Sequence, residues 1–168
     1  YEVRESLHLD ADQMELLSDT YKSFARNGAN LSKEDKEKYS TLSEEASLLG
    51  LQFSKNVLAA TNAYTLHITD SADLAGLPEY VKTAAKEAAA AKELEGWAFT
   101  LDQPSYSPFL KYSEKRELRQ QIWTAYNSKA LGGDNDNTQI VKDIVDHRMQ
   151  MTSLLGYDTY AEYALEER

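Results

Sequence analysis

The stretch 32–61 constrains the fold more than any other part of the chain. Its apolar side chains recur at the spacing of one helix face: Tyr39, Leu42, Ala46, Leu49, Phe53 and Ala60. Ser32 and Asp35 have the spacing of a capping box, in which the serine hydroxyl accepts from a free amide and the acidic side chain reaches back. We therefore predict one helix of about 28 residues, or ~42 Å. Gly50 lies inside it at a cost of roughly 0.8–1 kcal/mol relative to alanine.

A second helix is predicted before it, because four apolar residues repeat at intervals of three and four: Met14, Leu17, Tyr21 and Phe24. Gly28 follows this face and suits the left-handed position that ends a helix. A short turn then connects the two helices. We expect residues 1–62 to form an antiparallel helical hairpin.

The period changes to two after residue 62. Tyr64, Leu66 and Ile68 alternate with polar residues, and Trp97, Phe99 and Leu101 form a second alternating run. Between them, Pro78 fits the first position of an alanine-rich helix over 78–94, which Gly96 ends. Residues 63–102 are therefore predicted as strand, helix and strand. The strands could pair in parallel or antiparallel, and a parallel pair would need a right-handed crossover.

Residues 103–168 are predicted to be helical. Residues 102–108 contain two prolines and form a turn, and Ser107 and Pro108 mark the start of a helix over 109–126. The polar loop 131–137 follows, and Asn137 caps the next helix, which ends at Gly156. Asp158 caps a last helix. The expected fold is thus mostly α, a single domain over 1–168 with an antiparallel hairpin and a small two-stranded β element.

Charge and composition exclude several classes of function. The 168 residues include 18 basic and 28 acidic side chains, a net charge of −10. Such a chain repels phosphate, which argues against binding to nucleic acid or an anionic membrane. It contains no cysteine, and hence no disulfide or thiolate metal site. No apolar run approaches the ~18 residues that span a bilayer.

The three histidines are the natural candidates for a metal ligand or a base. His8 follows Glu5 at E-x-x-H spacing, but a di-iron bundle needs a second such motif. His67 lies on the polar side of the first strand, where we expect a solvated side chain. His147 lies among apolar positions, where we expect a partly buried ring with hydrogen-bond partners. None of the three opens an HExxH motif.

Two connecting segments complete the list of candidates. Asp134, Asp136 and Thr138 resemble the start of a calcium loop, but Gln139 and Val145 occupy the sixth and twelfth places, which require glycine and glutamate. We therefore expect a polar loop and a helix cap. No catalytic or metal-binding residue is assigned. The loop 131–137 and the turn Pro104–Pro108 are the candidates for contact with a ligand, against the alternative of ordinary connectors.

Several motifs in a fixed order resemble the thimet oligopeptidase family, which includes bacterial oligopeptidase A and peptidyl-dipeptidases. They are the L-A-G-L-P run ending at Pro78, the T-L-D-Q-P-S-Y run over 100–106, the L-R pair of the helix over 109–126, and the L-L-G-Y-x-x-Y-A run over 154–161. The Phe-x-x-x-Gly-Ala-x-Leu-Ser turn over 24–32 is similar too. The resemblance covers about residues 10–168.

This resemblance implies a zinc-dependent peptidase that cleaves short peptides in a channel between two helical halves. In that family an HExxH helix and a later glutamate hold the zinc, and the motif glutamate is the general base. These residues lie downstream of the matched segment, so none carries over to this chain. We expect residues 1–168 to be a non-catalytic piece, inert alone, that walls the channel, with the catalytic half as its partner.

Other properties remain open from the sequence. The cytoplasm is the expected location, with the periplasm or export as alternatives, because any signal would precede Tyr1. Dipeptidase and endopeptidase activity are not distinguished. The alternative function is a self-contained acidic helical interaction domain. Sequence beyond Arg168 discriminates: a later HExxH favours the peptidase, and a stop codon favours the interaction domain.

Overall fold

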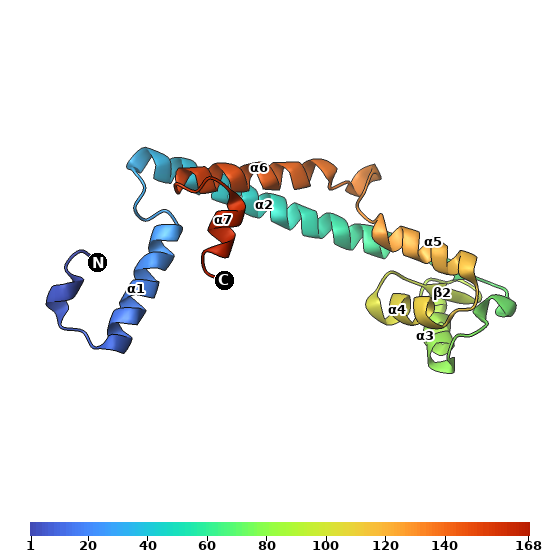
Figure 1. Ribbon diagram of the computed structural model, residues 1–168. Coiled ribbons are helices and arrows are strands. Elements are labelled where there is room, and N and C mark those ends of the chain that lie inside the picture. Colours follow the sequence, from blue (N-terminus) through green and yellow to red (C-terminus); the bar gives the residue numbers. More distant parts are fainter. The chain divides into compact units, whose positions relative to one another are not determined.

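The computed structural model describes residues 1–168, which form two compact units (Figure 1). One consists of Tyr1–Gly50 with Val141–Arg168, and the other is Leu51–Ile140. The helices are α1 (Ala11–Arg26), α2 (Lys33–Ala63), α3 (Glu79–Ala91), α4 (Gln103–Tyr112), α5 (Arg116–Asn127), α6 (Thr138–Leu154) and α7 (Tyr160–Leu165). The strands are β1 (Leu66–Ile68) and β2 (Trp97–Phe99). The mostly helical fold class with a small two-stranded element is confirmed. None of the helices is both long and apolar enough to cross a membrane.

The unit Leu51–Ile140 contains the hydrophobic core. Strands β1 and β2 pair antiparallel, with Leu66 opposite Phe99 and Ile68 opposite Trp97, so no crossover is needed. Leu66 and Ile68 point into the core, and His67 between them is exposed, as the alternating pattern predicts. Helix α3 packs on β2 through its small side chains, and Val81, Ala85 and Ala89 are buried. Phe99, Phe109 and Ile122 are fully buried at the centre.

Two glycines of this unit are required by close backbone approaches. Gly76 has φ +83°, and a Cβ atom there would lie 2.2 Å from the carbonyl oxygen of Tyr112. Gly96 has φ +88°, and its Cβ would lie 2.3 Å from the carbonyl oxygen of Ile68. Gly96 was expected to end α3, but the helix already ends at Ala91, and this glycine instead lets the chain pass close to β1. Pro78 caps α3 and is not its first residue.

The sequence after β2 folds differently from the prediction. Helix α4 begins at Gln103, so the expected turn Pro104–Pro108 is its first half, and Pro108 lies inside it. Asp102 is the N-cap residue, and its carbonyl accepts from the amides of Ser105 and Tyr106. The two prolines gave a turn signal, but Pro104 occupies the first turn, where a missing amide costs little.

The predicted helix over 109–126 is interrupted. Ser113 is buried, and the Glu114 amide donates to the carbonyl of Ala75 at 2.9 Å. Lys115 forms an ion pair with Asp73 at 3.0 Å. These contacts with the segment before α3 end α4 at Tyr112, and α5 starts at Arg116. The break therefore depends on residues about 40 positions earlier, which local spacing does not reveal.

In the other unit, the predicted turn between α1 and α2 is confirmed. Gly28 has φ +87°, and the Ala29 amide closes the turn on the Phe24 carbonyl. Ser32 accepts from the Asp35 amide at 3.1 Å, as the capping box predicts. The packing of α1 expected in a hairpin is not seen, because α1 has no buried residue and Phe24 is 65% exposed. The helix beside the first half of α2 is α6, which runs in the opposite direction (Figure 1).

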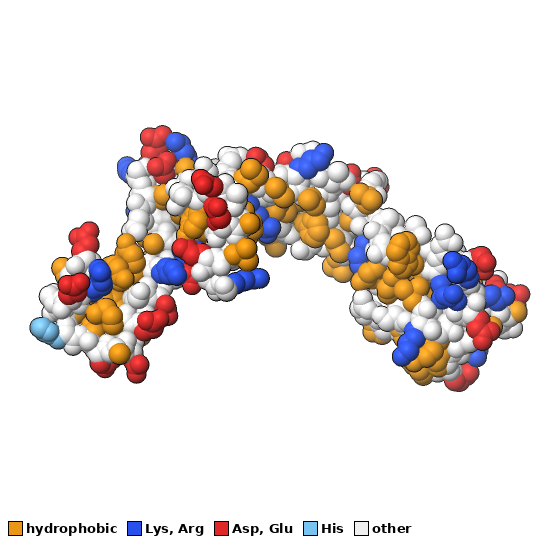
Figure 2. Space-filling view, viewed as in Figure 1, with side chains coloured by type: hydrophobic (Ala, Val, Ile, Leu, Met, Phe, Trp, Pro, Cys, Tyr) orange, Lys and Arg blue, Asp and Glu red, His pale blue; other side chains and the backbone are white.

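This unit has no hydrophobic core of its own. Every buried hydrophobic residue of the chain lies between Leu66 and Ile122, in the other unit. Large apolar side chains remain exposed on α2 and α6, including Leu48 and Met149. Hydrophobic side chains accordingly gather on the visible face of these helices (Figure 2). Because burial of apolar surface is the main force in folding, the unit is expected to depend on further contacts for its stability.

Two caps at the C-terminal end refine the prediction. Gly156 has φ +89° and follows the end of α6, as expected. Helix α7 is capped by Thr159 and not by Asp158: the Thr159 hydroxyl accepts from the Glu162 amide, and the Glu162 carboxylate accepts from the Thr159 amide. The expected cap was therefore one residue too early.

Candidate functional site

The three histidines lie in different environments. His8 is exposed, with φ +49°, just before α1. His67 is exposed, and its Nε2 lies 2.5 Å from the carbonyl oxygen of Glu95. His147 has two partners, because Nδ1 lies 2.7 Å from the Asp143 carbonyl oxygen and Nε2 lies 2.9 Å from the Glu45 carboxylate. The prediction of a partly buried, fully partnered ring at His147 is confirmed.

The contact of His147 with Glu45 joins α6 to α2. The hydrogen bond from the imidazole to the Glu45 carboxylate raises the pKa of His147 above its ordinary 6.5, and the Asp143 carbonyl acts in the same direction. Burial opposes this shift. The ring is therefore held between two helices by hydrogen bonds and is not a free base.

The loop 131–137 contains a single 3-10 turn, Gly133–Asn135. Asn137 was expected to cap α6, but Asp136 does so: its carboxylate accepts from the Thr138 amide at 2.9 Å and from the Thr138 hydroxyl at 2.7 Å. These bonds lower the pKa of Asp136. The acidic side chain in the calcium-like pattern thus works as a helix cap, which was the alternative interpretation.

Asn137 is instead buried against α2. Its Oδ1 accepts from Asn56 Nδ2 at 2.9 Å, and its Nδ2 donates to the Phe53 carbonyl at 3.1 Å. Asn56 is also buried and accepts from Gln52 at 2.6 Å. Buried amides keep such bonds because an unpaired polar group away from water is costly. The pair fixes the base of the loop 131–137 to α2 within the unit Leu51–Ile140.

The second candidate segment, Pro104–Pro108, lies beside a small hollow. Pro104 and Ser105 line it together with Ala98 and the small side chains of α3, and its volume is about 240 Å³. Ser105 is engaged elsewhere, since its hydroxyl accepts from the Thr100 amide at 3.0 Å. The hollow holds no set of charged groups aimed at a common point, so it defines no reaction centre.

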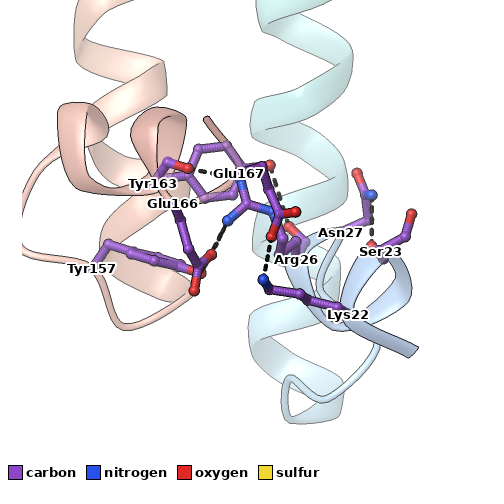
Figure 3. Close-up of polar contacts among 8 residues, drawn as sticks. All are labelled: Lys22, Ser23, Arg26, Asn27, Tyr157, Tyr163, Glu166 and Glu167. Carbon is purple, nitrogen blue, oxygen red and sulfur yellow. Dashed lines mark hydrogen bonds and ion pairs between the residues drawn. The ribbon is translucent and has the colours of Figure 1, made fainter. Parts of the chain in front are cut away.

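The most connected polar cluster was missed by the sequence analysis. Arg26, at the end of α1, reaches toward the segment 157–167 (Figure 3). Its guanidinium donates to the Tyr163 carbonyl at 2.7 Å and to the Tyr157 hydroxyl at 3.3 Å, and it forms an ion pair with Glu166. The guanidinium carbon also lies 4.2 Å from the centre of the Tyr163 ring, a cation–π contact. These contacts join the end of α1 to the segment 157–166, which lies 131–140 residues later in the sequence.

The hydrogen bonds of this Arg26 cluster shift the pKa values of its members. Glu166 accepts a 2.6 Å hydrogen bond from Tyr157. This bond, followed by the contacts with Arg26, lowers the pKa of Glu166. The same bond raises the pKa of Tyr157, and Arg26 opposes that rise. The Arg26 side chain is only 14% exposed, whereas the neighbouring Lys22–Glu167 pair is nearly half exposed on both sides. No periodicity in the sequence pairs residue 26 with residue 166, so only the tertiary structure reveals it.

The described residues 1–168 contain no group of three or more histidine, cysteine or acidic side chains that could hold a metal ion. Zinc in proteins needs three or four such ligands. The chain by itself therefore does not fit a zinc site, and no catalytic step is assigned to its residues. What its geometry provides is helix pairing, helix capping and the Arg26 cluster.

Comparison with known proteins defines the class. Oligopeptidase A of Escherichia coli K12 is 38% identical over 158 residues, which cover 91% of this chain and 23% of that protein. Dipeptidyl carboxypeptidase of the same organism is 33% identical over 170 residues, covering 100% and 25%. Probable cytosolic oligopeptidase A of Arabidopsis thaliana is 36% identical over 146 residues, covering 83% and 21%. These relatives are peptidases.

The family follows from the same comparison. Residues 109–168 match the model of peptidase family M3. The chain belongs to this family, and the resemblance drawn from its motifs is confirmed. It spans about a quarter of the length of the curated relatives that it matches.

Proposed function

We propose that residues 1–168 are a non-catalytic helical part of a zinc-dependent oligopeptidase or peptidyl-dipeptidase that hydrolyses short peptides. The observation that carries this proposal is the similarity to oligopeptidase A over 91% of the chain. The names of the relatives support peptide substrates. The cytoplasm is proposed as the location, in line with the name of the Arabidopsis relative, probable cytosolic oligopeptidase A.

The absence of three clustered metal ligands is compatible with zinc held by residues outside this chain. Zinc would supply a Lewis acid that lowers the pKa of a bound water. In this proposal the contribution of residues 1–168 is structural. They form a single non-catalytic domain that walls the channel and limits the length of peptide that enters.

The exposed apolar faces of α2 and α6 support a part that packs against more protein. Leu48 is 59% exposed and Met149 58% exposed, in a unit without a buried hydrophobic residue. The same faces would also serve the second candidate function, an acidic helical interaction domain without activity. The two functions differ in one measurable property, which is peptide hydrolysis by the full-length protein.

The test uses a quenched-fluorescent peptide of about nine residues and purified protein. The full-length protein that contains this sequence is expected to cleave it, and a chelator is expected to abolish cleavage. Residues 1–168 alone are expected to show no turnover and no stoichiometric zinc by mass spectrometry. Chelator-sensitive turnover by clean 1–168, or a one-to-one zinc content, would overturn the assignment. An inactive full-length protein would favour the interaction domain.

A further inference from the structure

A groove of about 810 Å³ runs between the first half of α2 and α6. Leu42 of α2 and Met149 and Leu154 of α6 provide its apolar surface, and Glu37, Lys38 and Asp146 lie at its rim. Met149 is 58% exposed, although it lies where two antiparallel helices meet. A third helix seated on such a pair buries its apolar stripe between two others, as in a helical bundle.

The unit that contains the groove lacks buried hydrophobic residues altogether. In a folded protein, a large exposed apolar surface rimmed by polar groups marks an interaction site. The groove therefore differs from the small hollow beside α3, which adjoins a complete core.

The charges around the groove indicate the chemistry of its occupant. Lys38 is neutralised by Glu34 at 2.8 Å and Asp35 at 3.8 Å. The Glu37 carboxylate has no partner, and Asp146 accepts only from the neutral amide of Gln150, at 2.6 Å. The whole unit holds 17 of the 28 acidic residues but only nine of the 18 basic ones. The rim is thus negative, and it is complementary to a cationic partner.

We propose that this groove binds an amphipathic helix whose apolar stripe is flanked by lysine or arginine, and that the remaining part of the same peptidase supplies it. The assignment of this helix to the remaining part of the peptidase rests on the proposed function. It follows from the length of the relatives, of which this chain covers about a quarter. Helix-in-groove docking of this kind uses apolar anchors at intervals of three and four residues.

The binding test uses residues 1–168 and a fluorescein-labelled 18-residue helix of leucine and lysine, followed by fluorescence anisotropy. Met149→Glu is expected to weaken binding at least tenfold. The matched control is Leu48→Glu, which places the same charge on a side chain that is 59% exposed and outside the groove lining. Both variants make the chain more acidic, so attraction by charge alone would strengthen binding in both. Equal binding by the two variants overturns the groove as the site.

Two further measurements fix the chemistry and the source of the helix. The leucine–glutamate version of the peptide is expected not to bind, and comparable binding would overturn the charge argument. Because the chain has no cysteine, a Met149→Cys thiol is a unique label in it. Its rate of alkylation is expected to fall at least tenfold in the full-length protein compared with 1–168. An unchanged rate overturns the assignment to the remaining part of the peptidase.

Failure of the groove and failure of the proposed function give different results. Loss of peptidase activity in the full-length protein would refute the enzyme assignment and leave the binding data intact. Dimerisation of 1–168 at micromolar concentration, abolished by Met149→Glu, would identify a second copy as the occupant and overturn the proposal.

Discussion

Gly76→Ala tests whether a single close approach organises the unit Leu51–Ile140. The added Cβ would lie 2.2 Å from the Tyr112 carbonyl oxygen and 2.8 Å from Glu114 Cγ. The residue would also have to keep φ +83°, which costs an L-residue about 1–2 kcal/mol. Relief of the clash would move Glu114, whose amide donates to Ala75 at 2.9 Å. Loss of that bond costs about 1 kcal/mol, and the overpacking roughly 1–3 kcal/mol.

The expected loss of unfolding free energy for Gly76→Ala is therefore on the order of 3–6 kcal/mol. Gly132→Ala is the matched control in the same unit, because Gly132 has φ +84° but no atom within 4 Å of its Cβ. Its ψ of 168° lies in a backbone region that is essentially restricted to glycine, so this variant should lose only the backbone part, on the order of 1–3 kcal/mol. The difference between the two variants isolates the contact with Tyr112.

Urea unfolding followed by tryptophan fluorescence measures this difference. Trp97 packs against the core of this unit, and Trp123 lies on α5 of the same unit. The midpoint should fall much further for Gly76→Ala than for Gly132→Ala. Equal midpoints would refute the reasoning, because they would mean that the tight passage between α4 and the segment before α3 carries no energetic weight.

Three further predictions concern polar contacts. Asn137→Ala leaves the Asn56 amide and the Phe53 carbonyl without their partner and should cost about 1–3 kcal/mol in the same urea experiment; no loss would mean that water replaces the bonds. Arg26→Gln should speed hydrogen exchange of the α7 amides at least about tenfold, since a hydrogen bond to a charged group is worth ~1.5–3 kcal/mol. Lys22→Gln removes only an exposed pair and should leave this exchange nearly unchanged. The pKa of His147 is raised in the folded state, so its contact with Glu45 contributes its full stability below the ordinary pKa of 6.5 and loses it as the pH rises through the raised folded-state pKa. Hydrogen exchange of the α6 amides should therefore quicken between pH 6.5 and the folded-state pKa. His147→Gln should remove this pH dependence of exchange.

The sequence was a good guide wherever one face of a regular element decides its structure. The apolar spacing from Tyr39 to Ala60 predicted a helix that the structure extends to 31 residues, Lys33–Ala63. Leu66 and Ile68 alternate with an exposed His67, and the strand formed there. In both cases a local period is enough, because burial of one face is what the element needs.

The failures share a physical cause, which is competition between a local signal and a distant contact. Asn137 has the side chain of a helix cap, but Asn56 and Phe53 offer it buried partners and Asp136 takes over the cap. The Ser107–Pro108 pair looks like a helix start, although Asp102 starts the helix five residues earlier.

The candidate site shows the same limit. Motifs identified the family without help from the tertiary structure. The Arg26 cluster and the α2–α6 groove both join segments more than 100 residues apart. Pairings of this kind lie beyond local periodicity, and only the arrangement of the helices brings them together.

The most direct test of the central claim is reconstitution of activity from two separately expressed pieces. Residues 1–168 are mixed with the remaining part of the full-length protein, and the rate of cleavage of the nine-residue peptide is measured. Neither piece alone should cleave it, and the mixture should show chelator-sensitive turnover. Turnover by residues 1–168 alone would contradict a non-catalytic role, and full activity of the remaining part alone would contradict any role of this chain in the peptidase.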